Sequence, residues 1–146
     1  MKVIGIIATM IFLVSIAYAG DKHTISGEVF FKKDGDIYLC LDTAEKFSES
    51  YSSRDYLSTG CQVIKMNADL KKAGRAAFKF VNVTKGTYGI IGFQDVNGNG
   101  KLDAANLLIN EPFGSYKEQK PEWSTFRWEE INFKLEEDIS DVKIQM

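Results

Sequence analysis

Short runs in which apolar and polar residues alternate are the feature that most constrains the fold of this chain. A period of two places successive side chains on opposite faces of an extended strand. Some of the runs alternate strictly, and others are rich in β-branched and aromatic residues, which strands favour. Six segments show one of these patterns: 25–31, 37–42, 77–83, 87–93, 131–135 and 142–146. The sequence therefore predicts six to seven short strands.

Turn-forming residues separate these segments. Lys33-Asp34-Gly35-Asp36 is typical of a tight hairpin between the first two strands. Thr84-Lys85-Gly86 and Glu136-Glu137-Asp138 mark two further turns. Short strands joined in this way indicate an all-β fold, an antiparallel β-sandwich of the transthyretin or immunoglobulin-like kind.

Three stretches fit no strand pattern. One helical turn is expected within 67–74, capped by Asn67 or Asp69. The stretches 43–60 and 104–125 are expected to be long irregular loops. Loops of that length inside a compact domain are usually functional or held in place by another feature.

The first nineteen residues have the pattern of a secretory signal peptide. Lys2 gives a positive start, and 3–16 is almost wholly apolar but too short to span a bilayer. Ala17-Tyr18-Ala19 then places small residues where a signal peptidase cuts. We expect cleavage after Ala19, which leaves 20–146 as a single β-sandwich domain that is periplasmic or secreted. The alternative is an uncleaved membrane anchor. The polar residues directly after Ala19 argue against it.

Export would decide how the two cysteines, Cys40 and Cys61, are used. In an oxidising compartment an isolated pair is more often a disulfide than a metal site. We therefore expect a disulfide. The alternative is two unpaired thiols, one of them packed as a small apolar side chain.

The segment Asp95–Asp103, which reads Asp-Val-Asn-Gly-Asn-Gly-Lys-Leu-Asp, carries the sharpest chemical signal. Its spacing matches most of the calcium loop of EF-hands, in which alternate residues direct oxygen atoms at one ion. Gly100 permits the sharp turn, and Leu102 is expected to point inward and anchor the loop. The predicted ligands all supply oxygen, and they are Asp95, Asn97, Asn99, Asp103 and the backbone carbonyl of Lys101.

The last position of the pattern departs from it. Asn106 stands where an EF-hand has a bidentate glutamate, so either Asn106 or Glu111 is expected to complete the shell. Few carboxylates imply a weak calcium site, with a dissociation constant of about 10⁻⁴–10⁻³ M. The alternative is a bare turn, because Asn97-Gly98 and Asn99-Gly100 both form turns without metal.

The run from Phe80 to Asp95, continued by the loop up to Asp103, resembles the signature of a bacterial family, domain of unknown function 2141. The centre of that family reads Gly-Thr-Tyr, an apolar strand, Asp, and then Asn-Gly-Asn-Gly-Lys-Leu-Asp. Residues 37–47 also resemble its earlier strand and loop. The resemblance covers 25–146 and implies an exported β-protein of unassigned activity. One departure is 107–115, where the family has a Gly-x-Pro stretch and a Gly-Phe-Ser-Asn-Asn-like loop.

The residues give little support for an enzyme. The only histidine, His23, lies beside the expected mature N-terminus, so no Ser-His-Asp or Cys-His site can be built unless that end folds back. One histidine and two cysteines also leave a zinc site without enough ligands. We therefore expect no catalytic residues and no cofactor other than calcium.

Composition limits the partners. A formal net charge of −2 at pH 7 gives no basic surface for nucleic acid, and none for an anionic membrane once the signal is removed. Trp123, Phe126 and Trp128 precede a strand and form a candidate platform for a glycan or protein ligand. Trp128 shares the parity of the polar residues of that strand, which predicts an exposed ring. The alternatives are rings that cover the end of the sandwich, or a purely structural role. The oligomeric state stays open.

Overall fold

The computed structural model describes residues 20–53, 61–105, 108–117 and 127–146. Ten strands and three helices lie within these residues. The strands are β1 (Lys22–Phe30), β2 (Asp36–Asp42), β3 (Gln62–Ile64), β4 (Arg75–Thr84), β5 (Gly86–Asp95), β6 (Ala104–Ala105), β7 (Leu108–Ile109), β8 (Phe113–Ser115), β9 (Asn132–Leu135) and β10 (Ile139–Gln145). The helices are α1 (Ala44–Ser53), α2 (Ala68–Ala73) and α3 (Trp128–Ile131).

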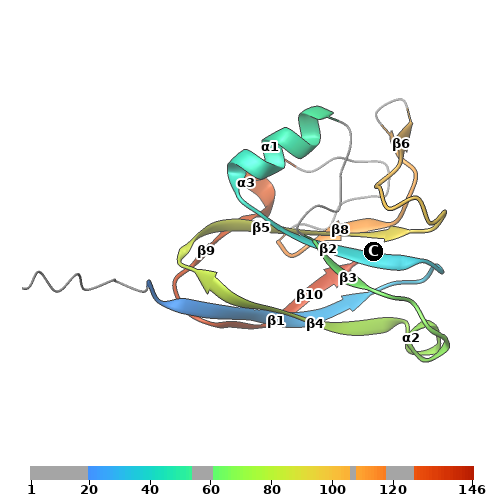
Figure 1. The fold of residues 1–146 in the computed structure, drawn as a ribbon, viewed down its shortest axis with the longest axis horizontal. Helices are drawn as coiled ribbons and strands as arrows, with labels where there is room; N and C mark the ends of the chain where they lie inside the picture. Colours follow the sequence, from blue (N-terminus) through green and yellow to red (C-terminus); the bar gives the residue numbers. More distant parts are fainter. Residues whose placement is uncertain (1–19, 54–60, 106–107, 118–126) are drawn as a thin grey trace, which may run out of the picture.

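Two sheets pack face to face, as predicted for a β-sandwich (Figure 1). The smaller sheet has the order β10-β1-β4. The larger has the order β3-β2-β5-β8, with β9 also paired to β5. Eight strands therefore build the two sheets, two of them short strands that the alternation pattern missed. Pairing is antiparallel except between β1 and β10, which run parallel. β6 and β7 pair with each other apart from both sheets.

The tight turns lie where the sequence predicts them, but they do not make hairpins. Each joins strands of opposite sheets: β1 to β2, β4 to β5, and β9 to β10. The predicted hairpin at 33–36 is therefore wrong in pairing, although the turn itself is present. A turn signal reports that the chain reverses and does not report whether the two strands share hydrogen bonds.

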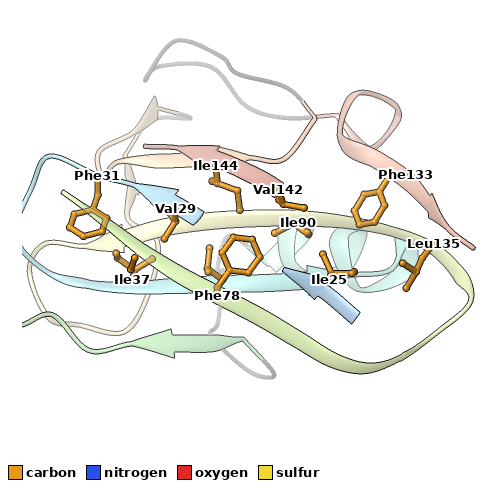
Figure 2. Close-up of a cluster of buried hydrophobic side chains, with 12 residues drawn as sticks. Ile25, Val29, Phe31, Ile37, Phe78, Ile90, Phe133, Leu135, Val142 and Ile144 are labelled. Atoms are coloured by element: carbon orange, nitrogen blue, oxygen red, sulfur yellow. The ribbon is translucent and has the colours of Figure 1, made fainter. Parts of the chain in front are cut away.

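The inner core fills the space between the two sheets (Figure 2). Ile25 and Val29 of β1 face Ile37 and Leu39 of β2 across this space, and all four side chains are buried. These are the residues that the period of two assigns to one face of each strand.

A second cluster, the outer core, covers the opposite face of the larger sheet. Tyr38 and Cys40 of β2 alternate with the inner-core residues and point into it. Helices α1 and α3 lie over this face (Figure 1), and Phe47 and Ile131 pack from them into the cluster. Because both faces of β2 and β5 are covered, Ile90, Ile91 and Phe93 are all buried, although they do not alternate.

Helix α2 confirms the predicted helical turn and its cap. The side chain of Asn67 accepts a hydrogen bond from the Leu70 amide at 2.9 Å, which satisfies a free donor of the first turn. Gly74 ends the helix in the left-handed conformation. The helix α1 was not expected, because 43–60 was predicted to be irregular. No helix among the described residues combines the length and the apolar character that crossing a bilayer requires.

Candidate functional site

The Asp95–Asp103 loop begins where β5 ends, so a strand leads into it as predicted. Gly98 and Gly100 have φ values of 76° and 74°, in the left-handed region that glycine adopts without strain. These two residues curl the chain back over the end of the strand. The backbone amides of the loop are thereby turned toward its first residue, Asp95.

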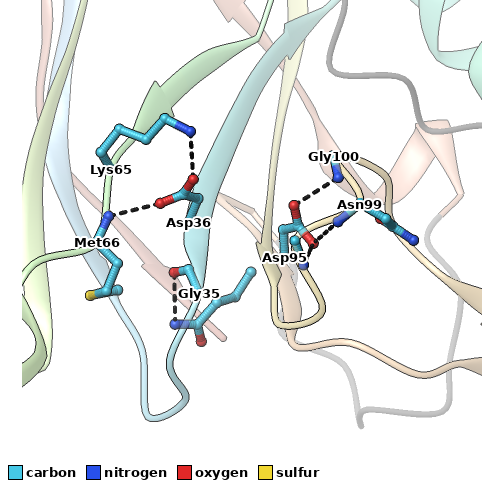
Figure 3. A network of polar contacts seen from close by, with 9 residues as sticks. Gly35, Asp36, Lys65, Met66, Asp95, Asn99 and Gly100 are labelled. Atoms are coloured by element: carbon cyan, nitrogen blue, oxygen red, sulfur yellow. Dashed lines mark hydrogen bonds and ion pairs between the residues drawn. The ribbon is translucent and has the colours of Figure 1, made fainter.

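The Asp95 carboxylate organises the loop. Asp95 is 3% exposed, and its side chain accepts three backbone hydrogen bonds (Figure 3). Oδ1 accepts from the amides of Gly98 at 2.8 Å and Asn99 at 3.1 Å, and Oδ2 accepts from Gly100 at 2.8 Å. Hydrogen bonds to an ionised acceptor are the stronger kind, so Asp95 fixes the backbone of the turn.

Three further predicted ligands, Asn97, Asn99 and Asp103, are joined by side-chain hydrogen bonds. The Asn99 side-chain amide donates to both carboxylate oxygens of Asp103 at 3.0 Å, and the Asn97 amide also donates to Asp103. The Oδ1 atoms of the two asparagines accept from the amides two residues further on, at 3.1 Å for Asn97 and 2.9 Å for Asn99. The side chains are therefore held at both ends.

Glu111 closes the base of the loop. It is 6% exposed, and its two oxygens accept from the amides of Val96 at 2.8 Å and Asp103 at 3.0 Å. It thus joins the two ends of the loop from a separate segment. Glu111 therefore lies beside the loop. Asn106 lies outside the described residues.

Leu102 anchors the loop in the outer core. It is 5% exposed and packs with Phe93 and Phe113, as its position in the pattern predicts. The Tyr38 hydroxyl lies beneath the turn, 3.7 Å from where a β-carbon on Gly100 would stand. The loop is therefore seated on the sheet by a buried side chain.

Asp36 is a neighbour of the site that the sequence analysis missed. It is the cross-strand partner of Asp95 in the β2–β5 pairing. Its carboxylate accepts from Lys65 Nζ at 2.6 Å and from the Met66 amide at 2.9 Å (Figure 3). These two hydrogen bonds lower the pKa of the Asp36 carboxyl. The signal was the register: a strand that starts at Asp36 after the turn brings it opposite the end of β5.

The turn before β2 packs directly on the start of the loop. A β-carbon on Gly35 would lie 2.1 Å from the Asp95 carbonyl oxygen, and Gly35 has a φ of 137°, so only glycine fits there. The Gln94 side chain is fully buried and donates to the Lys33 carbonyl at 2.7 Å. An open hollow of about 480 Å³ lies between the two turns, lined by Asp34, Asp36, Met66 and the start of the loop.

The donor set of the loop is suited to a hard cation. Within the described residues there is no group of three or more His, Cys, Asp or Glu side chains arranged to hold a metal ion. The loop combines the carboxylates of Asp95 and Asp103 with the amide oxygens of two asparagines. Oxygen ligands of this mixed kind are those that calcium accepts and that zinc and copper do not favour.

Of the candidate aromatic platform, Trp128 alone lies within the described residues. Trp128 lies in helix α3 and not in a strand, so the parity argument for an exposed ring was wrong. The ring is half-buried and packs on Phe47 of α1, with 5.6 Å between ring centroids. Trp128 thus covers the outer core. Trp123 and Phe126 lie outside the described residues.

The expected disulfide is present. Cys40 in β2 is bonded to Cys61, which precedes β3, and the described residues contain no free cysteine. The bond fixes the edge strand β3 against β2, where Leu39 pairs with Gln62 and Tyr38 with Val63. It also closes the chain segment that contains α1.

Comparison with known families gives one match. The profile of DUF2141, described as an uncharacterized protein conserved in bacteria, matches residues 28–143. Neither a curated protein sequence nor a solved structure matches the chain significantly. The match extends from the first strand of the smaller sheet to the last and includes the loop at Asp95–Asp103, so it spans the sandwich and its candidate site. The chain belongs to the DUF2141 family of bacterial proteins.

Proposed function

We propose that Asp95–Asp103 is a weak calcium-binding loop that stabilises a non-catalytic binding or structural module outside the cytoplasm. The observation that carries the proposal is the convergence of Asn97 and Asn99 on the Asp103 carboxylate, in a turn that Asp95 holds in place. A cation in place of these two amide groups would neutralise the Asp103 carboxylate. Rotation of each amide by half a turn exchanges its nitrogen for its oxygen, which is a calcium ligand.

The arrangement around the ion would be as follows. Asp95, Asn97, Asn99, Asp103 and the Lys101 carbonyl supply oxygens from within the loop. Glu111 is close enough to Asp103 and Val96 to complete the shell from the neighbouring segment. Binding would use hydrogen-bonding groups that at present satisfy one another, so part of the calcium binding energy is spent on breaking those contacts. This competition also favours a weak site.

Calcium is expected to raise the thermal stability of the wild-type protein. At an ion concentration about tenfold above the dissociation constant, mass action adds about 1.4 kcal/mol. That corresponds to a rise in Tm of roughly 4–7 °C for a domain of this size. Thermal unfolding in millimolar calcium and in chelator measures the increment. Magnesium should replace calcium poorly, because its octahedron at about 2.0–2.1 Å is too small for such a loop.

Two matched variants make the calcium test specific. D103N keeps an acceptor for the asparagine amides but removes a charged ligand, so its calcium increment should fall to a small fraction of the wild-type value. D34N neutralises an exposed carboxylate of the neighbouring turn, which pairs with Lys71 and not with the loop. It should retain the full increment. A wild-type Tm that is the same in calcium and in chelator would show that Asp95–Asp103 is a bare turn.

The extracytoplasmic location rests on two features. One is the disulfide between Cys40 and Cys61, a bond that is rare in reducing compartments. The other is the signal-like sequence of the first nineteen residues. Intact-mass analysis of the protein recovered from cell fractions should find a chain that starts at Gly20 outside the cytoplasm. A chain that retains Met1 in the membrane fraction would contradict this part of the proposal.

A further inference from the structure

The loop contains two Asn-Gly pairs in succession, Asn97-Gly98 and Asn99-Gly100. Asparagine followed by glycine is the sequence most open to spontaneous deamidation, because glycine has no side chain to shield its backbone nitrogen and can rotate freely. The glycine nitrogen loses its proton to solvent base and forms a bond to the asparagine Cγ. The Cγ–Nδ2 bond breaks, and the amide leaves as ammonia after taking up a proton. The product is a cyclic imide.

Water then opens the imide ring at one of two carbonyl carbons. Attack at Cγ gives aspartate, and attack at the backbone carbonyl gives isoaspartate, in which the main chain runs through the former side chain. Neither step needs an enzyme, an oxidant or a metal. Each product adds a carboxylate to the loop, and isoaspartate also adds a methylene group to its backbone. The reaction would therefore alter the site permanently.

We infer that Asn97 and Asn99 form a latent modification site for deamidation, and that the Asp95 carboxylate keeps both positions unreacted in the folded protein. The two nitrogens that would have to attack are the amides of Gly98 and Gly100. Each donates to an Asp95 oxygen at 2.8 Å, Gly98 to Oδ1 and Gly100 to Oδ2. The buried Asp95 side chain thus holds both of the nitrogens that would attack in hydrogen bonds.

The negative charge of the Asp95 carboxylate strengthens this protection. Removing the proton from either glycine amide would create a negative charge beside the Asp95 carboxylate. Because Asp95 is 3% exposed, water screens this repulsion poorly. The reactive anionic nitrogen is therefore disfavoured as long as the loop keeps its conformation.

The side-chain amides of Asn97 and Asn99, which the glycine nitrogens would attack, are restrained as well. The Asn97 Oδ1 accepts from the Asn99 amide, and the Asn99 Oδ1 accepts from the Lys101 amide. The Nδ2 atoms of both side chains donate to Asp103. Rotation of either side chain toward the neighbouring glycine nitrogen requires these contacts to break. Opening of the loop is thus the step that should control the reaction.

Ageing followed by peptide mapping tests the inference. Full-length wild type, D95N and D34N are incubated in mildly alkaline buffer with chelator, and wild type is also incubated in denaturant. Mass spectrometry of the loop peptide then measures the fraction of Asn97 and Asn99 in which –NH₂ has been replaced by –OH. D95N is expected to deamidate at least about tenfold faster than folded wild type, the factor that loss of a charge-assisted hydrogen bond brings. D34N should match the wild type.

A reference and a second variant keep the test decisive. Asn82 precedes Val83, whose branched side chain shields its nitrogen, so Asn82 should stay intact in every digest. D103N leaves the three Asp95 hydrogen bonds in place and should accelerate the reaction less than D95N. If D95N does not fold, two measurements on the wild type replace it. Deamidation should be slower in the folded than in the denatured protein, and the Gly98 and Gly100 amides should exchange hydrogen slowly.

Three results would overturn the inference. They are equal rates in folded and denatured wild type, a D95N protein that folds and reacts no faster than wild type, and an unfolded chain in which neither asparagine reacts. Because every sample contains chelator, failure of the calcium proposal would leave these results unchanged. Conversely, if calcium raises the Tm but D95N deamidates no faster than wild type, the calcium proposal stands and the deamidation inference fails.

Discussion

Replacing Phe93 with alanine is expected to lower the free energy of unfolding by about 3–5 kcal/mol, the range for removing a large buried aromatic side chain. Phe93 is fully buried in the outer core. Its ring stacks on that of Tyr38, its cross-strand partner, with 4.9 Å between centroids and 5° between planes. The substitution removes this pair and leaves a cavity beneath Leu102. Urea-induced unfolding, followed by fluorescence or circular dichroism, measures the change.

An exposed apolar residue provides the control. Val81 in β4 is 57% exposed, so Val81→Ala should change the free energy of unfolding by no more than about 0.5 kcal/mol. The contrast isolates burial from the general effect of shortening a side chain. A loss below about 1.5 kcal/mol for Phe93→Ala would mean that the outer core is not a packed layer of the fold.

Removing the disulfide is expected to cost about 3 kcal/mol, because Cys40 and Cys61 are separated by 21 positions and the bond restricts the unfolded chain. The double variant C40A/C61A is preferable to serine, since Cys40 is 2% exposed and a hydroxyl there would be buried. Its urea midpoint should lie well below that of the oxidised wild type. Wild type that has been reduced should resemble the double variant.

Reduction also separates the two contributions to this prediction. Reduced wild type keeps both sulfur atoms and their packing and loses only the covalent link. If its urea midpoint equalled that of the oxidised protein, the bond would not constrain the unfolded state. If the C40A/C61A variant is less stable than the reduced wild type, the difference measures the contribution of the packed Cys40 side chain.

The strands of the sandwich could be predicted because burial on one face imposes a period of two. The alternation across Ile37 and Leu39 assigned β2 correctly, down to the residues that face the inner core. The arrangement of strands could not be predicted. A turn such as 33–36 has the same residues whether the strands that it joins pair with each other or lie in different sheets.

Helix α1 shows how tertiary contacts decide a weak local preference. Its residues are polar and rich in serine, which argued for a loop. Thr43 offers a cap, since its hydroxyl accepts from the Lys46 amide at 3.4 Å. Phe47 then gives the helix one buried anchor in the outer core. The cap could have been found from the sequence, but the docking of Phe47 could not.

The loop was predicted more completely than its surroundings. Leu102 points into the outer core, as the spacing predicts, because a short loop with two left-handed glycines fixes its own geometry. Glu111 lies at the base of the loop, but its bonds to two amides come from a segment whose path the sequence does not specify. The prediction of an exposed Trp128 ring was wrong for a related reason. The parity of β9 was extended backward through residues that form a helix.

The parallel pairing of β1 with β10 has a consequence for the order of folding. Ile25 pairs with Ile139 and Phe30 with Gln145, so β1 pairs on one side with a strand that lies far along the chain. The amide of Met146 donates to the Phe30 carbonyl at 3.0 Å, which extends this contact beyond the end of β10. Contacts so distant in sequence form late and slowly. The smaller sheet is therefore expected to close after the turns that join neighbouring strands have formed, so its assembly sets the pace of folding.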